Sequence, residues 1–136
     1  MKTARITRLA ALKRQVELQK WLGESSRLNA EITRLDERIE QVIVLKNVYD
    51  EQLRQPSLTA QELIGIRIVD SHLNDRRQID QNRRELLQNE RRRVAVMLAA
   101  KKNEVDSLKS EANQLKRAEA EERLEHQQSL MPARRV

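Results

Sequence analysis

The stretch Leu53-Arg-Gln-Pro-Ser-Leu-Thr-Ala-Gln-Glu-Leu63 separates two long helical patterns and decides the fold. A helix cannot continue through Pro56, because the proline ring clashes with the preceding turn and the residue has no N–H group to donate. Thr59 and Glu62 have the spacing of a capping box, in which each side chain accepts a hydrogen bond from the backbone N–H of the other residue. The chain is therefore predicted to end one helix before Pro56 and to begin another at once.

A connection of about five residues is typical of antiparallel neighbouring helices. We predict an all-α fold in which two long helices form an antiparallel coiled-coil hairpin. The expected helices cover residues 3–54 and 60–129, with the turn at residues 55–59. Residues 1–130 would form one domain, and residues 131–136 would form a flexible tail. A coiled coil formed between separate molecules would use the same helices. Sedimentation would distinguish it from the hairpin by its larger mass.

The composition favours a coiled coil over a globular domain. Of the 136 residues, 35% are charged and 1% are aromatic, and there are two glycines and no cysteine. A chain rich in charged residues, Leu and Ala with helical periodicity is typical of long packed helices. The longest apolar runs, 42–45 and 94–100, are far shorter than the roughly 20 residues of a membrane span. We expect a cytoplasmic protein without membrane insertion.

Two apolar patterns with different phases are present in the first predicted helix. From residue 28 to residue 53 the seam positions follow one another in steps of four and three, the spacing of a heptad repeat. These positions are Leu28, Ile32, Leu35, Ile39, Val42, Lys46, Tyr49 and Leu53. Upstream, Ile6, Leu9, Leu12 and Val16 suggest a seam in another phase, so we expect a shift and a soft point near Gly23. Trp21 is either a seam residue or a partner-facing anchor.

The second predicted helix has a less continuous apolar seam. Its expected members are Leu63, Ile66, Val69, Leu73, Val94, Met97, Leu98, Val105, Leu108, Ala112 and Leu115, with a thin stretch between residues 74 and 93 that has only Ile79, Leu86 and Leu87. In an antiparallel hairpin, facing residues have numbers with a constant sum. A sum of 115 aligns apolar residues at several levels and pairs Leu28 with Leu87. This register also places the basic N-terminal residues beside 91–93 and 101–102.

Nothing in the sequence has the spacing of a catalytic or metal site. Gly23 and Gly65 are isolated, so no phosphate-binding glycine loop is present. His72 with Asp75 could supply two metal ligands on one helix face, but a solvated surface histidine is the simpler interpretation, since two ligands seldom suffice. A two-helix fold also has no concave interior in which to assemble an active site. We predict a protein that is not an enzyme and uses no cofactor.

The net charge of +6 favours acidic partners. The basic residues that the expected register gathers near the termini are Arg8, Arg14, Arg91, Arg92, Arg93, Lys101 and Lys102. They form either a solvated face or a docking surface for an acidic protein or for nucleic acid. Nucleic-acid binding usually adds stacking aromatic side chains, and the chain has almost none. A protein partner is favoured, and a generic basic coiled-coil adaptor or nucleic-acid-associated protein is the alternative.

Three segments resemble the FliJ/YscO family, the central stalk proteins of bacterial flagellar and type III secretion export ATPases. Residues 42–53 look like the end of the family's first helix, where a tyrosine precedes the loop. Residues 94–108 look like part of its second helix, and the charged run to Gln128 is similar to its terminus. The turn is shorter than in the family, and the second predicted helix has no tryptophan.

The resemblance implies a non-enzymatic stalk that is peripheral to the inner-membrane secretion apparatus. Such a stalk inserts into the hexameric export ATPase ring, promotes its assembly and activity, and links it to the export gate protein and to export chaperones. The seven basic residues named above would contact the ATPase ring. By position, the export-gate contact would be Val69, Leu73, Arg76 and Asp80. The sequence leaves open a flagellar or a virulence system, and which end of the hairpin meets the ATPase.

Overall fold

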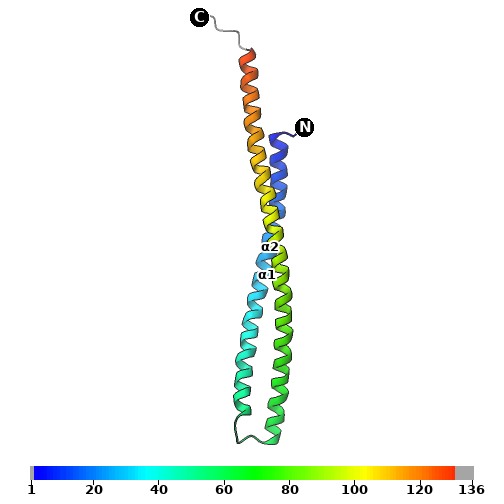
Figure 1. The fold of residues 1–136 in the computed structure, drawn as a ribbon, viewed down its shortest axis with the longest axis vertical. Coiled ribbons are helices and arrows are strands. Elements are labelled where there is room, and N and C mark those ends of the chain that lie inside the picture. Colours follow the sequence, from blue (N-terminus) through cyan, green and yellow to red (C-terminus); the bar gives the residue numbers. More distant parts are fainter. Residues whose placement is uncertain (1, 131–136) are drawn as a thin grey trace. The chain divides into compact units, whose positions relative to one another are not determined.

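The computed structural model describes residues 2–130 of the chain. It contains two α-helices, α1 (Ala4–Leu53) and α2 (Ala60–Leu130), and no strand among the described residues (Figure 1). The predicted all-α helical hairpin is confirmed, and each helix boundary lies within one residue of the prediction. The predicted flexible tail, residues 131–136, lies outside the described residues.

The connection between the helices has the local chemistry that the sequence predicts. The backbone N–H of Thr59 donates to Glu62 Oε2 at 3.4 Å, and the N–H of Glu62 donates to Thr59 Oγ1 at 3.2 Å. These two bonds satisfy N–H groups that have no acceptor within the first turn of α2. Leu58 and Leu63 are both half-buried, as a hydrophobic staple requires. The capping box is therefore what starts α2 directly after the turn.

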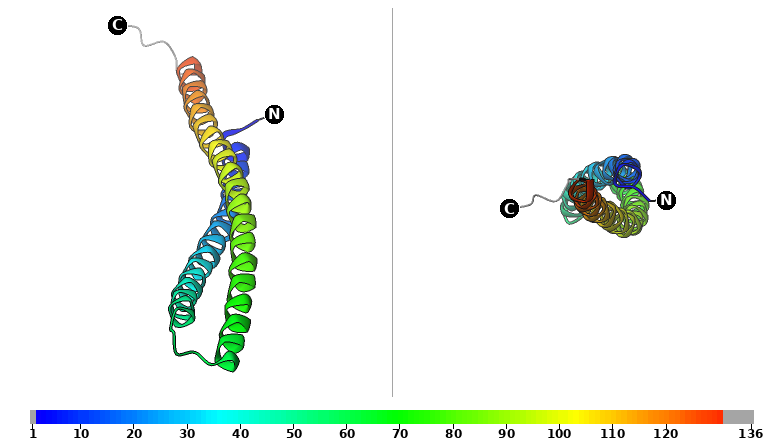
Figure 2. Two further views of the ribbon diagram at one scale, coloured as in Figure 1. Left: turned by 60° about the horizontal axis from the view of Figure 1, so that its bottom comes forward. Right: turned by 90° about the horizontal axis from the view of Figure 1, so that it is seen from above.

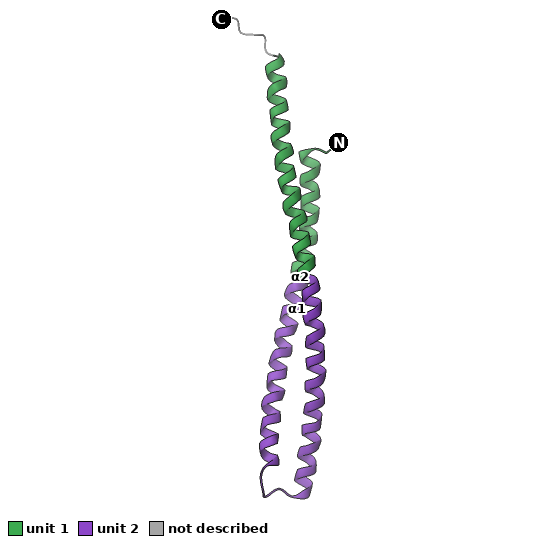
Figure 3. Ribbon diagram, viewed as in Figure 1, with its two compact units in different colours: residues 1–23, 95–136 green, residues 24–94 purple. Residues whose placement is uncertain are grey.

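The chain divides into two compact units, each of which contains part of both helices (Figure 3). Unit 1 consists of Met1–Gly23 and Ala95–Val136, of which the structure describes residues 2–23 and 95–130. Unit 2 consists of Glu24–Val94 and has the interhelical connection at one end (Figure 2). Each unit is described separately below.

The seam of unit 2 is apolar on the α1 side. Leu28 is completely buried, Ile32, Leu35 and Val42 are at most 7% exposed, and the remaining predicted positions are half-buried. On the α2 side, Leu87 is buried as well. The heptad repeat that the sequence shows from residue 28 onward is therefore the core of this unit.

The α2 side of the same seam is largely polar. The positions between Leu63 and Leu87 that are buried or half-buried are Ile66, Asp70, Leu73, Arg77, Asp80 and Arg84. Val69, which the sequence suggested as a seam residue, is 37% exposed, and Asp70 takes the seam position instead. The stretch that was predicted to be thin in apolar residues is thus a layer of charged side chains.

The N-terminal part of α1 in unit 1 differs from the prediction. Ala4, Thr7 and Ala11 are buried there, and α2 contributes the buried Val105 and Ala112. The predicted N-terminal seam faces outward, since Ile6, Leu9, Leu12 and Val16 are 53–60% exposed. The expected phase shift is therefore wrong. The buried and half-buried positions 4, 7, 11, 14, 18 and 21 continue the heptad that runs on through residue 28.

Ion pairs connect the two helices within each unit. In unit 1, Arg14 pairs with Glu104 and Glu17 pairs with Lys101. In unit 2, Arg38 pairs with Asp80. The residue numbers of these three pairs sum to 118. Those of the other interhelical pairs, Lys2–Glu111, Glu31–Arg83 and Asp36–Arg84, sum to 113, 114 and 120, so the range includes the predicted 115.

Replacing Gly23 with alanine is expected to stabilise the protein by about 0.5–1 kcal/mol, because glycine is a poor helix former and the site lies inside α1. Apart from its chain neighbours and the nearby backbone of α1, a Cβ atom at this position would have no atom within 4 Å, so the substitution introduces no clash. Urea denaturation followed by circular dichroism measures the change. Gly65→Ala is the matched control in α2, where the surroundings are equally open. A loss of stability only in Gly23→Ala would show that the residue serves as a break in α1.

Candidate functional site

The net positive charge of the protein belongs entirely to unit 1. Unit 2 has 13 basic and 13 acidic residues, whereas unit 1 has 14 basic and 8 acidic residues. The N-terminal part of unit 1 is the more basic part, with six Lys or Arg residues and one acidic residue among residues 1–23. Unit 1 is therefore the part of the chain that attracts acidic partners.

Four charged side chains form a closed network between the two helices of unit 1. Arg14 Nη1 lies 3.0 Å from Glu17 Oε2, and Arg14 Nε lies 3.6 Å from Glu104 Oε2. Lys101 Nζ lies 3.2 Å from Glu17 Oε2 and 3.5 Å from Glu104 Oε2. Each cation thus has two carboxylate partners. The network links α1 to α2 and leaves Arg14 and Lys101 with their charges balanced.

The network also shifts the acid–base equilibria of its members. Hydrogen bonds from Arg14 and Lys101 lower the pKa of Glu17 below its ordinary value of 4.5. The hydrogen bond with Glu17 raises the pKa of Arg14. Because the side chains of Arg14 and Glu17 are 43% and 31% exposed, water and salt screen much of this interaction.

Acidification is expected to weaken unit 1. A carboxylate with a lowered pKa in the folded state stabilises that state above its unfolded pKa, here near 4.5, and the contribution disappears as the pH falls through the folded pKa. The melting temperature should therefore decrease between about pH 5 and pH 3. Thermal denaturation of the protein and of Glu17→Gln, in low and high salt, measures this dependence. The variant should show a shallower decrease, and equal slopes would contradict the role of Glu17.

Further contacts attach the start of α1 to α2 within unit 1. Lys2 Nζ pairs with Glu111 at 3.2 Å, and the backbone N–H of Ala4 donates to Glu119 Oε1 at 3.0 Å. Thr3 Oγ1 accepts a hydrogen bond from the N–H of Ile6 at 3.2 Å, which caps the helix. Carboxylates near a helix N-terminus are favoured by the helix dipole. The first turn of α1 is thus held by acidic side chains of α2.

The structure separates the seven basic residues that the sequence grouped as an ATPase contact. Arg8 and Lys102 are exposed in unit 1, whereas Arg14 and Lys101 belong to the interhelical network described above. Arg91, Arg92 and Arg93 are exposed but belong to unit 2. In unit 1, the polar contacts of residues 2–17 of α1 with α2 reach residues 101–119.

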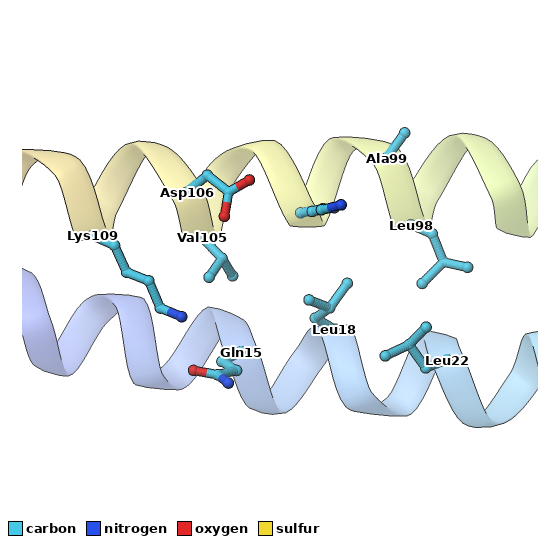
Figure 4. A pocket seen from close by; sticks show the side chains of 9 residues that line it. Gln15, Leu18, Leu22, Leu98, Ala99, Val105, Asp106 and Lys109 are labelled. Atoms are coloured by element: carbon cyan, nitrogen blue, oxygen red, sulfur yellow. The ribbon is translucent and has the colours of Figure 1, made fainter.

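An apolar groove of about 400 Å³ lies between the two helices of unit 1 (Figure 4). Leu18 and Leu22 of α1 and Leu98 and Val105 of α2 point into the space between the helices. Charged and polar side chains from both helices border it, and these are Gln15, Lys102, Asp106 and Lys109. This groove could not be predicted from the sequence, because its lining depends on which residues of α2 face Leu18.

The four residues suggested as an export-gate contact differ in accessibility. Val69 is 37% exposed and the Arg76 side chain is 48% exposed, so both can reach a partner. Leu73 is half-buried in the seam. Asp80 is only 1% exposed and lies near Arg38 and Arg76. Asp80 cannot therefore contact a partner while unit 2 is folded, and its place in the suggested set is wrong.

Residues 2–130 contain neither a metal-binding cluster nor a segment suited to span a membrane. No group of three or more His, Cys, Asp or Glu side chains is arranged to hold a metal ion. Neither α1 nor α2 has a segment of the length and apolar character that crossing a bilayer requires. His72 is exposed in unit 2, and His126 is exposed in unit 1. Trp21 is half-buried at a seam position of unit 1, so it is a seam residue and not a fully exposed anchor for a partner.

The comparisons with known proteins add no relative. No family model, no curated protein and no solved structure matches the chain.

Proposed function

We propose that the protein is a non-enzymatic stalk of a bacterial type III export apparatus, which binds a hexameric export ATPase and links it to an export gate and to export chaperones. The observation that supports this proposal most is the location of the entire net charge of +6 in unit 1, while unit 2 is neutral. A basic segment at one part of a helical hairpin suits the acidic lining of a ring. The resemblance of residues 42–53 and 94–108 to the stalk family agrees with this role.

In this proposal, unit 1 enters the ring and Arg8 and Lys102 meet acidic side chains of the ATPase. Both residues are exposed, so their charges are available to a partner. Arg14 and Lys101 act indirectly, because they hold α1 and α2 in register through Glu17 and Glu104. A two-helix stalk presents different faces to the subunits around it. It therefore stabilises different subunit conformations to different extents and biases their nucleotide states.

The other suggested contacts have supporting surfaces in unit 2. Exposed Arg91, Arg92 and Arg93 form a second basic cluster for the ATPase or for a chaperone. The proposed gate contact keeps Val69 and Arg76, which are exposed, and excludes the buried Asp80. Exposed Ile64 and Ile68 are close in sequence to Val69 and give this surface an apolar component.

The direct test measures ATP hydrolysis and hexamer content of an export ATPase from the same organism, with and without the protein. Both quantities should rise when the stalk is present, since ring assembly brings the catalytic interfaces together. An ATPase whose hydrolysis and assembly are unchanged would reject the proposal. A gel-shift assay with DNA and RNA at physiological salt tests the nucleic-acid alternative, and tight binding there with no ATPase effect would favour it.

Charge reversal in unit 1 should weaken the ATPase contact. Arg8→Glu combined with Lys102→Glu is expected to reduce affinity about tenfold at low ionic strength and less at high salt, because exposed charges are screened. The matched control is Arg34→Glu with Arg67→Glu, which reverses two exposed arginines of unit 2. Titration of the labelled protein with the ATPase measures both affinities. Equal losses in the two variants would show that net charge, and not unit 1, determines binding.

A further inference from the structure

The outward face of α1 in unit 1 is an exposed apolar stripe with basic borders. We name it the N-terminal stripe. Its apolar members are Ile6, Leu9, Leu12 and Val16, each 53–60% exposed. In a helix, the positions opposite the seam residues 4, 7 and 11 also include Arg5, Lys13, Gln19 and Lys20, all exposed. This face therefore combines four apolar and three basic side chains with no acidic one.

The outward face of α1 in unit 2, close to the turn, has the opposite charge. We name it the turn stripe. Its apolar members are Val44, Leu45 and Val48, which are 47–54% exposed. The remaining outward positions of this stretch are Glu37, Glu40, Gln41, Asn47, Glu51 and Gln52, all exposed. A shallow hollow of about 460 Å³ lies beside this surface and is lined by Val44, Asn47, Val48, Asp50, Glu51 and Arg54.

Neither stripe is covered by another part of the described chain, and each has three or four exposed aliphatic side chains. Exposed apolar residues that gather on one helix face, with charged borders, are typical of a docking surface for another helix. Two N-terminal stripes would repel each other, because each has three cations and no anion. Two turn stripes would repel each other in the same way. A basic stripe and an acidic stripe are complementary.

We infer that a second copy of this chain is the occupant, with the N-terminal stripe of one copy docked on the turn stripe of another. This pairing buries aliphatic side chains on both surfaces and places Arg5, Lys13 and Lys20 near glutamates. An anionic lipid surface would match the N-terminal stripe alone and would leave the turn stripe uncovered. The self-association requires no ATPase, so it stands or fails separately from the proposed stalk function.

The contact is expected to be weak and sensitive to salt. Each stripe offers only three or four aliphatic side chains, which corresponds to an interface at the low end of known sizes, below about 1,200 Å² in total. The charge complementarity at its borders is exposed and is screened at high ionic strength. Sedimentation equilibrium from about 10 µM to 1 mM protein, in low salt, should therefore show reversible association.

Two complementary variants test the pairing. Variant A is Lys13→Glu with Lys20→Glu, which makes both of its stripes acidic. Variant B is Glu37→Lys with Glu51→Lys, which makes both of its stripes basic. All four positions are exposed, and no side-chain hydrogen bond or ion pair involves them among the described residues. The association constant of each variant alone is expected to fall at least about fivefold, and an equimolar mixture of the two should regain the association of the wild type.

The mixture distinguishes a specific pairing from a general effect of charge. Recovery in the mixture supports docking between unlike stripes of two copies. A wild-type chain that stays monomeric at 1 mM, or variants that associate as well as the wild type, would overturn the inference. Variants that fail alone and also fail when mixed would overturn it too. The matched control, Arg67→Glu with Lys116→Glu, reverses exposed charges on α2 and should associate like the wild type.

A lipid assay covers the competing occupant. Sedimentation with vesicles of phosphatidylcholine, with and without 30% phosphatidylserine, measures membrane binding of the wild type and of variant A. Binding to the anionic vesicles by a protein that remains monomeric would assign the N-terminal stripe to lipid and would overturn the self-docking inference. Circular dichroism of each variant checks that its helices are retained.

Discussion

Replacing Leu28 with alanine is expected to lower the free energy of unfolding by about 3 kcal/mol. The Leu28 side chain is fully buried at 0% exposure, in the same seam as Ile32, Leu35 and Leu87. Truncation removes its buried methyl groups and leaves a cavity, and both effects destabilise the folded state. Urea denaturation of the full chain, followed by circular dichroism at 222 nm, measures the loss.

Leu9→Ala is the matched control for this prediction, because the residue type and the helix are the same. Leu9 is 56% exposed, so its truncation should change the free energy of unfolding by no more than about 0.5 kcal/mol. The two variants together test the heptad that runs through α1 as one register. A cost at Leu9 equal to that at Leu28 would show that the N-terminal stripe is a seam. Equal and small costs would show that Leu28 is not in the core.

The turn could be predicted because it depends on local chemistry. Pro56 excludes a continuous helix whatever the rest of the chain does. The capping box of Thr59 and Glu62 lies within four consecutive residues at the helix start. Both hydrogen bonds of the box are present. The helix boundaries follow from the same residues, and for this reason they agree with the structure to within one residue.

The seam of unit 1 follows the heptad periodicity and not the largest apolar side chains. Ile6, Leu9 and Leu12 are the most apolar residues near the N-terminus, yet they face outward. Counting back from Leu28 in steps of three and four leads to Trp21, Leu18, Ala11 and Ala4, which are buried or half-buried. Small residues such as alanine let two helices approach closely. The buried face of a long helix pair is determined by the contacts along its whole length. The more apolar face near the N-terminus is therefore not the buried one.

The partners of charged residues depend on a register that the sequence fixes only approximately. A basic N-terminal region is evident from composition, but the acids that Arg14 and Lys101 meet depend on the exact register of the two helices. With the observed register, both bind Glu17 and Glu104, and their charges are used within unit 1. The buried position of Asp80 did have a sequence signal. It lies seven residues after Leu73 and seven before Leu87, which are both seam positions.

Replacing Asp80 with leucine is expected to raise the free energy of unfolding by about 2 kcal/mol. The carboxylate is 1% exposed, and its Oδ2 atom has no hydrogen-bond donor. The nearest cations, Arg76 and Arg38, lie 3.5 and 3.8 Å from that oxygen, too far to offset the loss of hydration fully. Both arginine side chains are about half exposed, so they remain hydrated when the carboxylate is removed. Leucine then extends the apolar seam of unit 2.

Asp75→Leu is the matched control, since Asp75 is exposed on the same helix and should show a change within about 0.5 kcal/mol. Asp80→Ala separates removal of the charge from filling of the seam, and it should be less stable than Asp80→Leu by about 2–3 kcal/mol because it leaves a cavity. Denaturation of the three variants in urea provides the comparison. If Asp80→Leu proved less stable than the wild type, the carboxylate would be a net stabilising partner of Arg38 and Arg76. That result would show that the charged layer of unit 2 strengthens the pairing of the two helices. The long distances from Asp80 to Arg38 and Arg76 indicate the opposite, namely that the layer weakens this pairing.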